Sequence, residues 1–228
     1  MPGTPAISPK RAAKLKAKKY REAERLFLAE GAAVLDEAHM APLCVFEEVE
    51  QIHRVSTLKT PVGPIGVFPF LDATVEEVLS RVPRIVLLHG VQDPGNVGTA
   101  IRSAYAFGSG VALSKATADL YNPKTVRASM GSIFHAPVTR EVDSVAFLET
   151  AREAGFALVA AVPEAEESPK SLPKGKLVVC IGAEGSGLPE KVVGACRSRV
   201  GIPSLAPSLN ASMAASILLY EAYSRVLP

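Results

Sequence analysis

Apolar and polar positions follow one regular pattern from residue 84 to the end of the chain. Short apolar runs alternate with stretches whose apolar residues recur at helical spacing. Because the runs are almost continuously apolar and alternate with helices, the pattern predicts an α/β fold with a mainly parallel sheet and helices on both faces. The predicted strands are residues 84–89, 110–114, 156–162, 177–182 and 199–202, and the predicted helices are 98–107, 123–130, 144–154, 189–195 and 210–226.

The pattern before residue 84 is less regular. Residues 10–38 carry apolar side chains near helical spacing, which predicts one or two amphipathic helices interrupted at Gly31. Residues 42–46 and the Pro- and Gly-rich stretch 61–69 predict short strands. The spacing of the apolar residues changes between residues 72 and 83. We therefore expect a small α+β domain at residues 1–76 and a larger α/β domain at residues 77–228.

Composition indicates a globular protein, because 48% of the 228 residues are hydrophobic. The formal net charge is only +2, but basic residues gather near the N-terminus, where they suit a polyanion or, equally well, a solvated helix face. No apolar block follows them and no run is long enough to span a bilayer, so we expect a cytoplasmic protein without membrane contact. The clustered cations are Lys10, Arg11, Lys14, Lys16, Lys18, Lys19, Arg21 and Arg25.

Cysteine and histidine spacing indicates neither a disulfide framework nor a metal site. The three cysteines are far apart and form no CxxC pair, and the four histidines show no metal-ligand spacing. His89 ends an apolar strand, where a packing or hydrogen-bonding role is the simpler interpretation.

The loop after the strand 84–89 is the first with features of a ligand site. It contains Pro94, Gly95 and Gly98, and it carries Asn96 before a helix whose first turn is expected to hold Arg102. The glycines do not have the GxGxxG spacing, and no GK[ST] occurs in the chain. A nucleotide-dependent oxidoreductase is therefore disfavoured.

Two later strands end in similar loops. The strand 177–182 runs into GAEGSGLPE, and the strand 199–202 runs into IPSLAPSLNAS, which opens the last helix. Taken alone, Ser208 or Asn210 is explained by helix capping. Taken together, the three loops would converge on one crevice, because the carboxyl ends of parallel strands share one edge.

These loops match three ordered motifs. Asn96–Arg102 fits the first motif, Asn–x–Gly–x–x–x–Arg, and Gly182–Leu188 fits the second, Gly–x–Glu–x–x–Gly–Leu. The third motif is a strand-ending Ile–Pro and then Ser–Leu–Asn–x–Ser before a helix, and Ile202-Pro203 followed by Ser208–Ser212 fits it. On these residues, and on residues 127–131, the chain resembles the SpoU/TrmH family of the SPOUT superfamily. Members of that family are S-adenosylmethionine-dependent RNA ribose 2′-O-methyltransferases.

The resemblance covers about residues 84–226, and the turn in the third motif is shorter than usual and lacks glycine. Residues 27–31 and 57–61 resemble, more weakly, the small L30e-like RNA-binding domain that many members carry. The resemblance implies a deep trefoil knot at the C-terminal end of the sheet and a homodimer with each site completed across the interface. The expected cofactor-binding residues are Gly182, Ala183, Glu184, Gly185, Gly187, Ile202, Ser204, Leu209, Asn210 and Met213.

The chemistry of the reaction assigns roles to the polar residues. A ribose 2′-hydroxyl is a poor nucleophile, so the protein must position it and stabilise negative charge on its oxygen. Arg102 is expected to supply the positive charge that stabilises this oxygen. It is not expected to act as a base, because a guanidinium stays protonated in proteins. Asn96 orients Arg102 or the ribose, Glu184 pairs with one of these two side chains, and Ser208 with Asn210 orders the substrate end.

The sequence thus predicts a methyltransferase that acts on the ribose 2′-hydroxyl of RNA, with ribosomal RNA favoured over transfer RNA. The alternative is a non-catalytic RNA-binding protein that retains the fold. No metal is expected. The helix 210–226 is apolar on more than one face, which predicts a homodimer unless both faces are buried within one chain.

Overall fold

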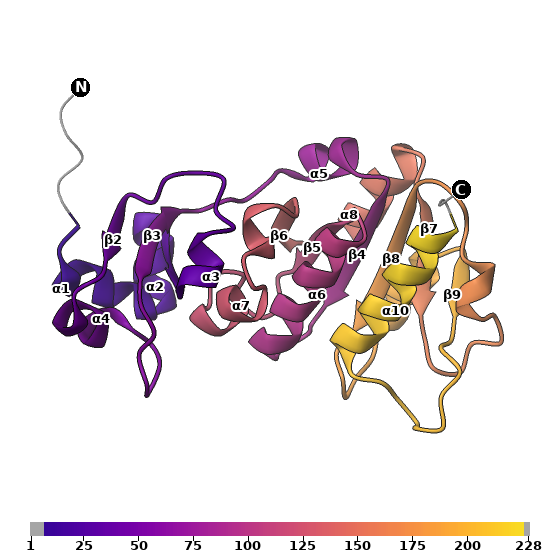
Figure 1. The fold of residues 1–228 in the computed structure, drawn as a ribbon. Helices are drawn as coiled ribbons and strands as arrows, with labels where there is room; N and C mark the ends of the chain where they lie inside the picture. The colour runs from indigo at the N-terminus through magenta and orange to yellow at the C-terminus, as the bar shows by residue number, and fades with distance from the viewer. Residues whose placement is uncertain (1–6, 226–228) are drawn as a thin grey trace.

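The computed structural model describes residues 7–225, which form two sheets one after the other along the chain (Figure 1). The first sheet has three antiparallel strands in the order β1-β3-β2. The strands are β1 (Leu26–Glu30), β2 (Cys44–Phe46) and β3 (Ile65–Pro69). Short helices surround it: α1 (Pro9–Ala12), the 3-10 turn η1 (Ala13–Lys16), α2 (Lys18–Glu24), α3 (Ala32–Leu35) and α4 (Val49–Val55).

The helical prediction for residues 10–38 is partly wrong, because this segment contains β1. Ala17 is extended and Arg25 adopts a left-handed conformation, with φ 52° and ψ 43°, so the helices end before Leu26. All five residues of β1 are buried, and this run of apolar residues was mistaken for one face of a helix. The basic segment is also packed rather than free, because Ala12 and Leu15 are fully buried.

The second sheet has six strands in the order β6-β5-β4-β8-β7-β9, and every pairing is parallel. This confirms the predicted α/β fold with a mainly parallel sheet. The strands are β4 (Arg84–His89), β5 (Gly110–Ser114), β6 (Val138–Val142), β7 (Ala157–Ala161), β8 (Leu177–Gly182) and β9 (Ser198–Val200). The edge strand β6 was not predicted, because its sequence VTREV places Arg140 and Glu141 among apolar residues.

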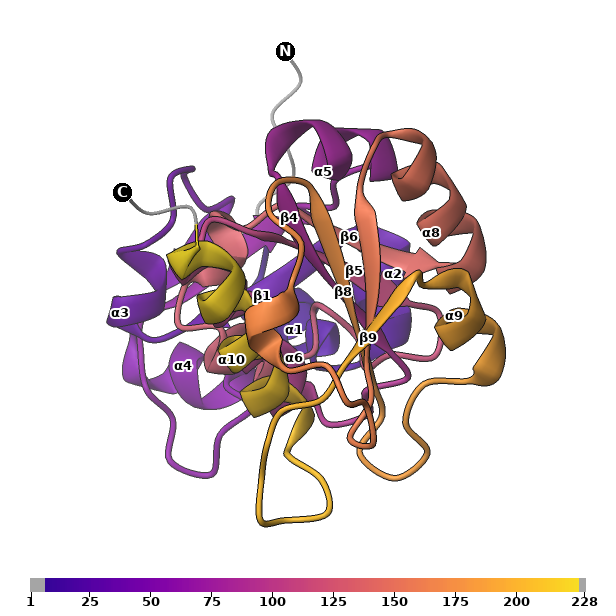
Figure 2. The same ribbon diagram turned by 90° about the vertical axis from the view of Figure 1, so that its right-hand side faces the viewer.

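Helices cover both faces of this sheet, as predicted (Figure 2). One apolar core joins the sheet to α6 (Pro94–Ala106), α7 (Pro123–Ala128) and α10 (Ala211–Ser224). The other core joins it to α5 (Val75–Arg81), α8 (Ser144–Glu153) and α9 (Glu190–Ala195). Successive residues of β4, β5 and β8 alternate between the cores, as the pleat requires. The 3-10 turns η2 (Ser132–Phe134) and η3 (Pro169–Ser171) complete the fold.

Buried polar contacts fasten the small sheet to the large one. Arg21, whose side chain is only 3% exposed, donates to the Asp119 carboxylate at 2.5 Å. Arg140 bridges Asp72 at 2.9 Å and Glu22 at 2.8 Å. Burial alone would raise the pKa of Asp72, but hydrogen bonds from Arg140 and Tyr121 outweigh it and hold this pKa below its ordinary value. The predicted boundary between residues 76 and 77 lies inside α5.

Candidate functional site

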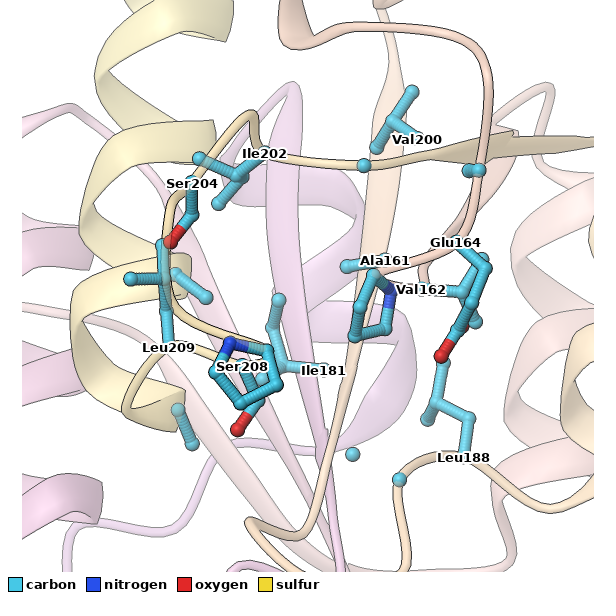
Figure 3. A pocket seen from close by; sticks show the side chains of 18 of the residues that line it. Ala161, Val162, Glu164, Ile181, Leu188, Val200, Ile202, Ser204, Ser208 and Leu209 are labelled. Carbon is cyan, nitrogen blue, oxygen red and sulfur yellow. The ribbon is translucent and has the colours of Figure 1, made fainter.

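A pocket lies where the loops after β7, β8 and β9 meet, and we call it the large pocket. Its volume is about 640 Å³. Figure 3 shows Ile202, Ser204, Ser208 and Leu209 along one side and Glu164 and Leu188 along the other. Two of the three loops that were expected to converge, those after β8 and β9, line the large pocket together with the loop after β7, whereas the loop after β4 contributes no residue to its lining.

One wall of the large pocket depends on Gly182, the last residue of β8. A Cβ atom built on Gly182 would lie 2.2 Å from the carbonyl carbon of Gly187 and 2.5 Å from the nitrogen of Leu188. Gly187 has a φ of +64° and pairs back to Ala183 in an isolated β-bridge. The loop thus folds tightly onto its own strand and presents backbone groups to the pocket.

Asn96 joins the three motifs through its side-chain amide. Its Oδ1 accepts hydrogen bonds from Asn210 Nδ2 at 3.0 Å and from Ser212 Oγ at 3.3 Å, while its Nδ2 donates to Glu184 Oε1. Asn210 caps α10, because its Oδ1 accepts from the backbone nitrogens of Ser212 and Met213. That cap leaves only the Asn210 amide nitrogen for Asn96. The orientation of both amides follows from this network.

The position of Asn96 differs from the predicted one, because α6 begins four residues earlier than expected. Asp93 caps the helix and Pro94 is its first residue, so Asn96 lies in the first turn rather than in the loop. Gly98 is also helical, and a Cβ there would lie 2.4 Å from the Thr125 carbonyl oxygen. Gly98 therefore permits close packing of α6 against α7 and does not shape a ligand loop.

Arg102 lies nearly two turns beyond Asn96, about 9 Å along the helix axis. Six residues also rotate it by about 240° around the helix, onto a different face. It is exposed, and within residues 7–225 no ion pair or side-chain hydrogen bond engages its guanidinium. Within the first motif, Asn96 thus contacts α10 and its cap, whereas Arg102 is exposed to solvent. Of the two predicted partners for Glu184, the structure pairs it with Asn96.

The large pocket is acidic. Glu164, Glu166 and Glu184 line it, and no lysine, arginine or histidine is found among its described lining residues. Apolar side chains, including Ile181, Leu188 and Leu209, provide the remaining wall. A ligand with phosphate groups would find no cation here, whereas a ligand with a flat apolar part and a positive charge fits both features.

Most of the predicted cofactor-binding residues line the large pocket, and two do not. The lining includes Gly182, Ala183, Glu184, Gly185, Gly187, Ile202, Ser204 and Leu209, together with Ser208. Asn210 faces the Asn96 network, and Met213 is 56% exposed on α10. The loop after β7 also lines the pocket between Val162 and Ser168, and no part in the site was predicted for it from the sequence. Ser212 was also missed, since a serine near a helix start usually indicates capping alone.

The remaining histidine and cysteine observations concern local packing. His89 Nδ1 lies 2.8 Å from Ser144 Oγ, and the Cys180 and Cys196 sulfurs are 3.7 Å apart as free thiols. In residues 7–225 no group of His, Cys, Asp or Glu is arranged to hold a metal ion. Across the same residues, no helix has both the length and the hydropathy needed to cross a membrane.

The parallel sheet, the acidic pocket behind three strands and the joined motifs define an α/β protein of the RNA methylase type. The chain belongs to the SpoU rRNA Methylase family, whose model matches residues 83–220. It is 31% identical over 240 residues to the 23S rRNA (guanosine(2553)-2′-O)-methyltransferase RlmP of Bacillus subtilis, covering 91% of this chain and 92% of that protein.

Solved structures agree over nearly the whole chain. A structure of a TrmH-family RNA methyltransferase from Porphyromonas gingivalis has a TM-score of 0.84 and 28% identity, covering 98% of this chain and 99% of that one. An AdoMet-bound rRNA methyltransferase from Sinorhizobium meliloti has a TM-score of 0.83 and 27% identity, covering 96% and 95% respectively. Both likenesses extend over the small sheet as well as the large one.

Proposed function

We propose that this protein transfers a methyl group from S-adenosylmethionine to the ribose 2′-hydroxyl of an RNA, with ribosomal RNA as the substrate class. The observation that carries the proposal is the Asn96–Glu184–Asn210 network, which joins all three motifs beside an acidic pocket. Family membership and the RlmP relative supply the reaction type. The ribosomal preference has support from the same relative, although TrmH-family tRNA/rRNA methyltransferases are also similar to this chain.

The large pocket fits the cofactor in size and in charge. Backbone groups of the loops at Gly182–Leu188 and Ile202–Leu209 would hold it, and the apolar wall suits its adenine ring. When bound, S-adenosylmethionine supplies an electrophilic methyl on a positively charged sulfur. Glu164, Glu166 and Glu184 favour a cation at that position, which agrees with the absence of phosphate-binding residues from the described lining.

The chain's remaining task is to prepare the hydroxyl. Methyl transfer would pass the hydroxyl proton to water and leave negative charge developing on the ribose oxygen. Arg102 stabilises the negative charge that develops on the oxygen, through donors held in a rigid fork. Asn96 is held by Glu184 and Asn210 and keeps the motif loops in register, while Ser208 lies on the pocket rim for the substrate side.

We further propose that the working unit is a homodimer, in which Arg102 completes the site of the second copy. Arg102 is exposed and points away from Asn96, so it does not serve the pocket of its own chain directly. Met213, Ile217 and Tyr220 form one exposed apolar stripe along α10, beside α6. Ile217→Asp should therefore yield a monomer of 24.0 kDa in sedimentation that retains cofactor binding but not methylation. A dimeric Ile217→Asp variant would contradict this interface.

The finer features of the fold are proposed on the same basis. A knot is supported by the path after β9, where Gly201 donates to the Glu167 carbonyl at 2.8 Å and the Arg225 guanidinium reaches the Lys170 carbonyl. Residues 1–76 are proposed as an L30e-like RNA-binding domain and residues 77–228 as the methyltransferase domain. Together they suit a cytoplasmic enzyme acting on RNA.

Replacement of Arg102 tests the function. Arg102→Ala should leave S-adenosylmethionine affinity nearly unchanged, while the rate of single-turnover methylation falls by roughly 100-fold, the scale for losing one oxyanion-stabilising donor. Arg102→Lys should restore the rate in part, since it keeps the charge but not the planar fork. Isothermal titration with cofactor and methylation of ribosomal RNA measure the two effects. Unchanged methylation by Arg102→Ala would remove this residue from the mechanism, and a wild-type protein that binds RNA without methylating it would favour the non-catalytic alternative.

A further inference from the structure

A second, smaller pocket lies at the same edge of the parallel sheet as the large pocket. Its volume is about 110 Å³, and it is lined by the ends of β4, β5 and β6, by the start of α8 and by one residue of α9. His89, Lys115, Ser144 and Lys191 are among its lining residues, and we call it the lysine pocket. His89 is paired in register with Gly182, so the lysine pocket begins one strand away from the start of the second motif loop.

The charges around the lysine pocket are mainly positive. Lys115 and Lys191 are exposed, and neither ammonium has an ion pair or side-chain hydrogen bond within residues 7–225. Asp143 is the one carboxylate in the lining, and its Oδ1 accepts from the backbone nitrogens of Val145 and Ala146 at 3.0 and 3.1 Å. These contacts occupy the N-terminal amides of α8. The groups left to bind an anion are therefore the two ammonium groups and the Ser144 hydroxyl.

The pKa of His89 shows that the charge of Lys191 acts on this space. Burial lowers the pKa of His89, and the positive charge of Lys191 lowers it further, whereas Asp143 opposes the shift. Its Nδ1 lies 2.8 Å from Ser144 Oγ, which fixes the ring at the pocket wall. An anion placed between the lysines would offset their charge and raise the pKa of His89.

The size of the lysine pocket limits what it can hold. A volume of about 110 Å³ has room for a few groups the size of water, at about 30 Å³ each, and is smaller than the roughly 300–1,000 Å³ of ordinary ligand pockets. It therefore accepts one phosphate group but not a base or a nucleoside. The lysine pocket includes His89, the last residue of β4, and the loop after that strand leads to Asn96.

We propose that the lysine pocket binds a backbone phosphate of the RNA substrate, next to the nucleotide that is methylated. This inference rests on the proposed function, because it assumes an RNA in the neighbouring site. Phosphate contacts position a nucleic acid without reading its sequence. Lys115 and Lys191 would accordingly fix the register of the RNA and leave the choice of base to other contacts.

Lysine substitutions test the proposal. Lys115→Ala combined with Lys191→Ala should weaken binding of a short single-stranded RNA, and the slope of log affinity against log salt should become shallower by about 0.7 for each phosphate that the variant no longer neutralises. Lys174→Ala is the matched control, because Lys174 is exposed just before β8, at the opposite end of that strand. S-adenosylmethionine affinity should stay unchanged in all three proteins. Equal salt slopes in the wild type and the double variant, or an equal weakening with Lys174→Ala, would overturn the proposal.

The imidazole signals of His89 in proton NMR give a second readout. Both inorganic phosphate and the short RNA should raise the pKa of His89 in the wild type, and the double lysine variant should lose both shifts. A shift with phosphate alone overturns the assignment to RNA. Loss of methylation in a protein that still binds RNA, with the His89 shift intact, counts against the proposed function but supports the lysine pocket.

Discussion

Replacing Gly182 by alanine is the sharpest test of how the large pocket is built. The added Cβ would lie 2.2 Å from the carbonyl carbon of Gly187 and 2.4 Å from its oxygen, whereas an ordinary contact begins at 3.4 Å. Since both opposing atoms belong to the backbone, no side-chain rotation relieves the overlap. The loop must retreat from β8 by about 1 Å, which is the difference between the ordinary contact distance of 3.4 Å and the overlapping distances of 2.2 and 2.4 Å.

The cost of that movement should appear in ligand binding. Overpacking a well-packed site costs about 1–3 kcal/mol. Residues Glu184–Gly187 are exposed, so the free protein can move the loop outward with little loss of stability. Binding must then restore the original loop, which lowers affinity for S-adenosylmethionine by about 5- to 150-fold. The melting temperature should change little by comparison.

Two glycines provide controls for Gly182→Ala. Gly185 lies in the same loop and Gly194 lies in α9, and a Cβ on either would meet nothing within 4 Å. Gly194→Ala should preserve cofactor affinity, and Gly185→Ala should show whether any side chain in this loop disturbs binding. Isothermal titration and thermal denaturation measure both quantities. Wild-type affinity in Gly182→Ala would refute the tight loop geometry, and a large fall in melting temperature would show that the loop cannot move independently.

Other substitutions address stability and charge. Arg21→Met leaves the Asp119 carboxylate without its ion-pair partner and should lower the unfolding free energy by about 3–5 kcal/mol, which corresponds to a fall in melting temperature of about 6–20 °C. An unchanged melting temperature would show that the pair is dispensable. The pKa of Asp72 is lowered in the folded protein, so its contribution to stability is present above the ordinary pKa of 3.8 and is lost as the pH falls further. Asp72→Asn should therefore make the unfolding free energy depend less on pH in acid. An unchanged acid transition would exclude this role. Glu164→Gln combined with Glu166→Gln should reduce the preference for S-adenosylmethionine over its uncharged-sulfur product by about two- to tenfold. Glu167→Gln is the control, because Glu167 lies outside the pocket lining. If direct titration gives the double variant the same ratio of the two affinities as the wild type, these charges are screened.

Sequence patterns predicted the elements whose burial is periodic or continuous. The predicted bounds of β4, β5 and β8 match the observed ones, because nearly all residues of these strands are apolar and buried on both faces. The edge strand β6 was not predicted, because one side of an edge strand faces solvent and its sequence therefore combines apolar and charged residues. β1 was mistaken for a helix because five consecutive buried residues also satisfy helical spacing over so short a stretch.

The site was predictable at the level of loops but not of side-chain pairs. Parallel strands place their carboxyl ends on one edge, so the meeting of the motifs followed from the strand order. The bonds of Asn96 depend on where α6 begins, and Pro94 moved that start towards the N-terminus of the chain. A shift of this size turns Asn96 from a loop residue into a helical one that faces α10. Helix boundaries are the least certain part of a sequence pattern, and the direction of Arg102 depends on the same boundary.

Charge is divided along the carboxyl edge of the sheet in a way that suits a cationic cofactor and a polyanionic substrate. The large pocket presents carboxylates, while Lys115, Lys191 and the exposed Arg102 lie outside its lining. A phosphate group is therefore repelled from the pocket and attracted to its surroundings. An RNA strand held in this way presents a neutral hydroxyl, rather than a phosphate, to the acidic pocket. The separation of charge thus keeps phosphates out of the acidic pocket without any contact to a base.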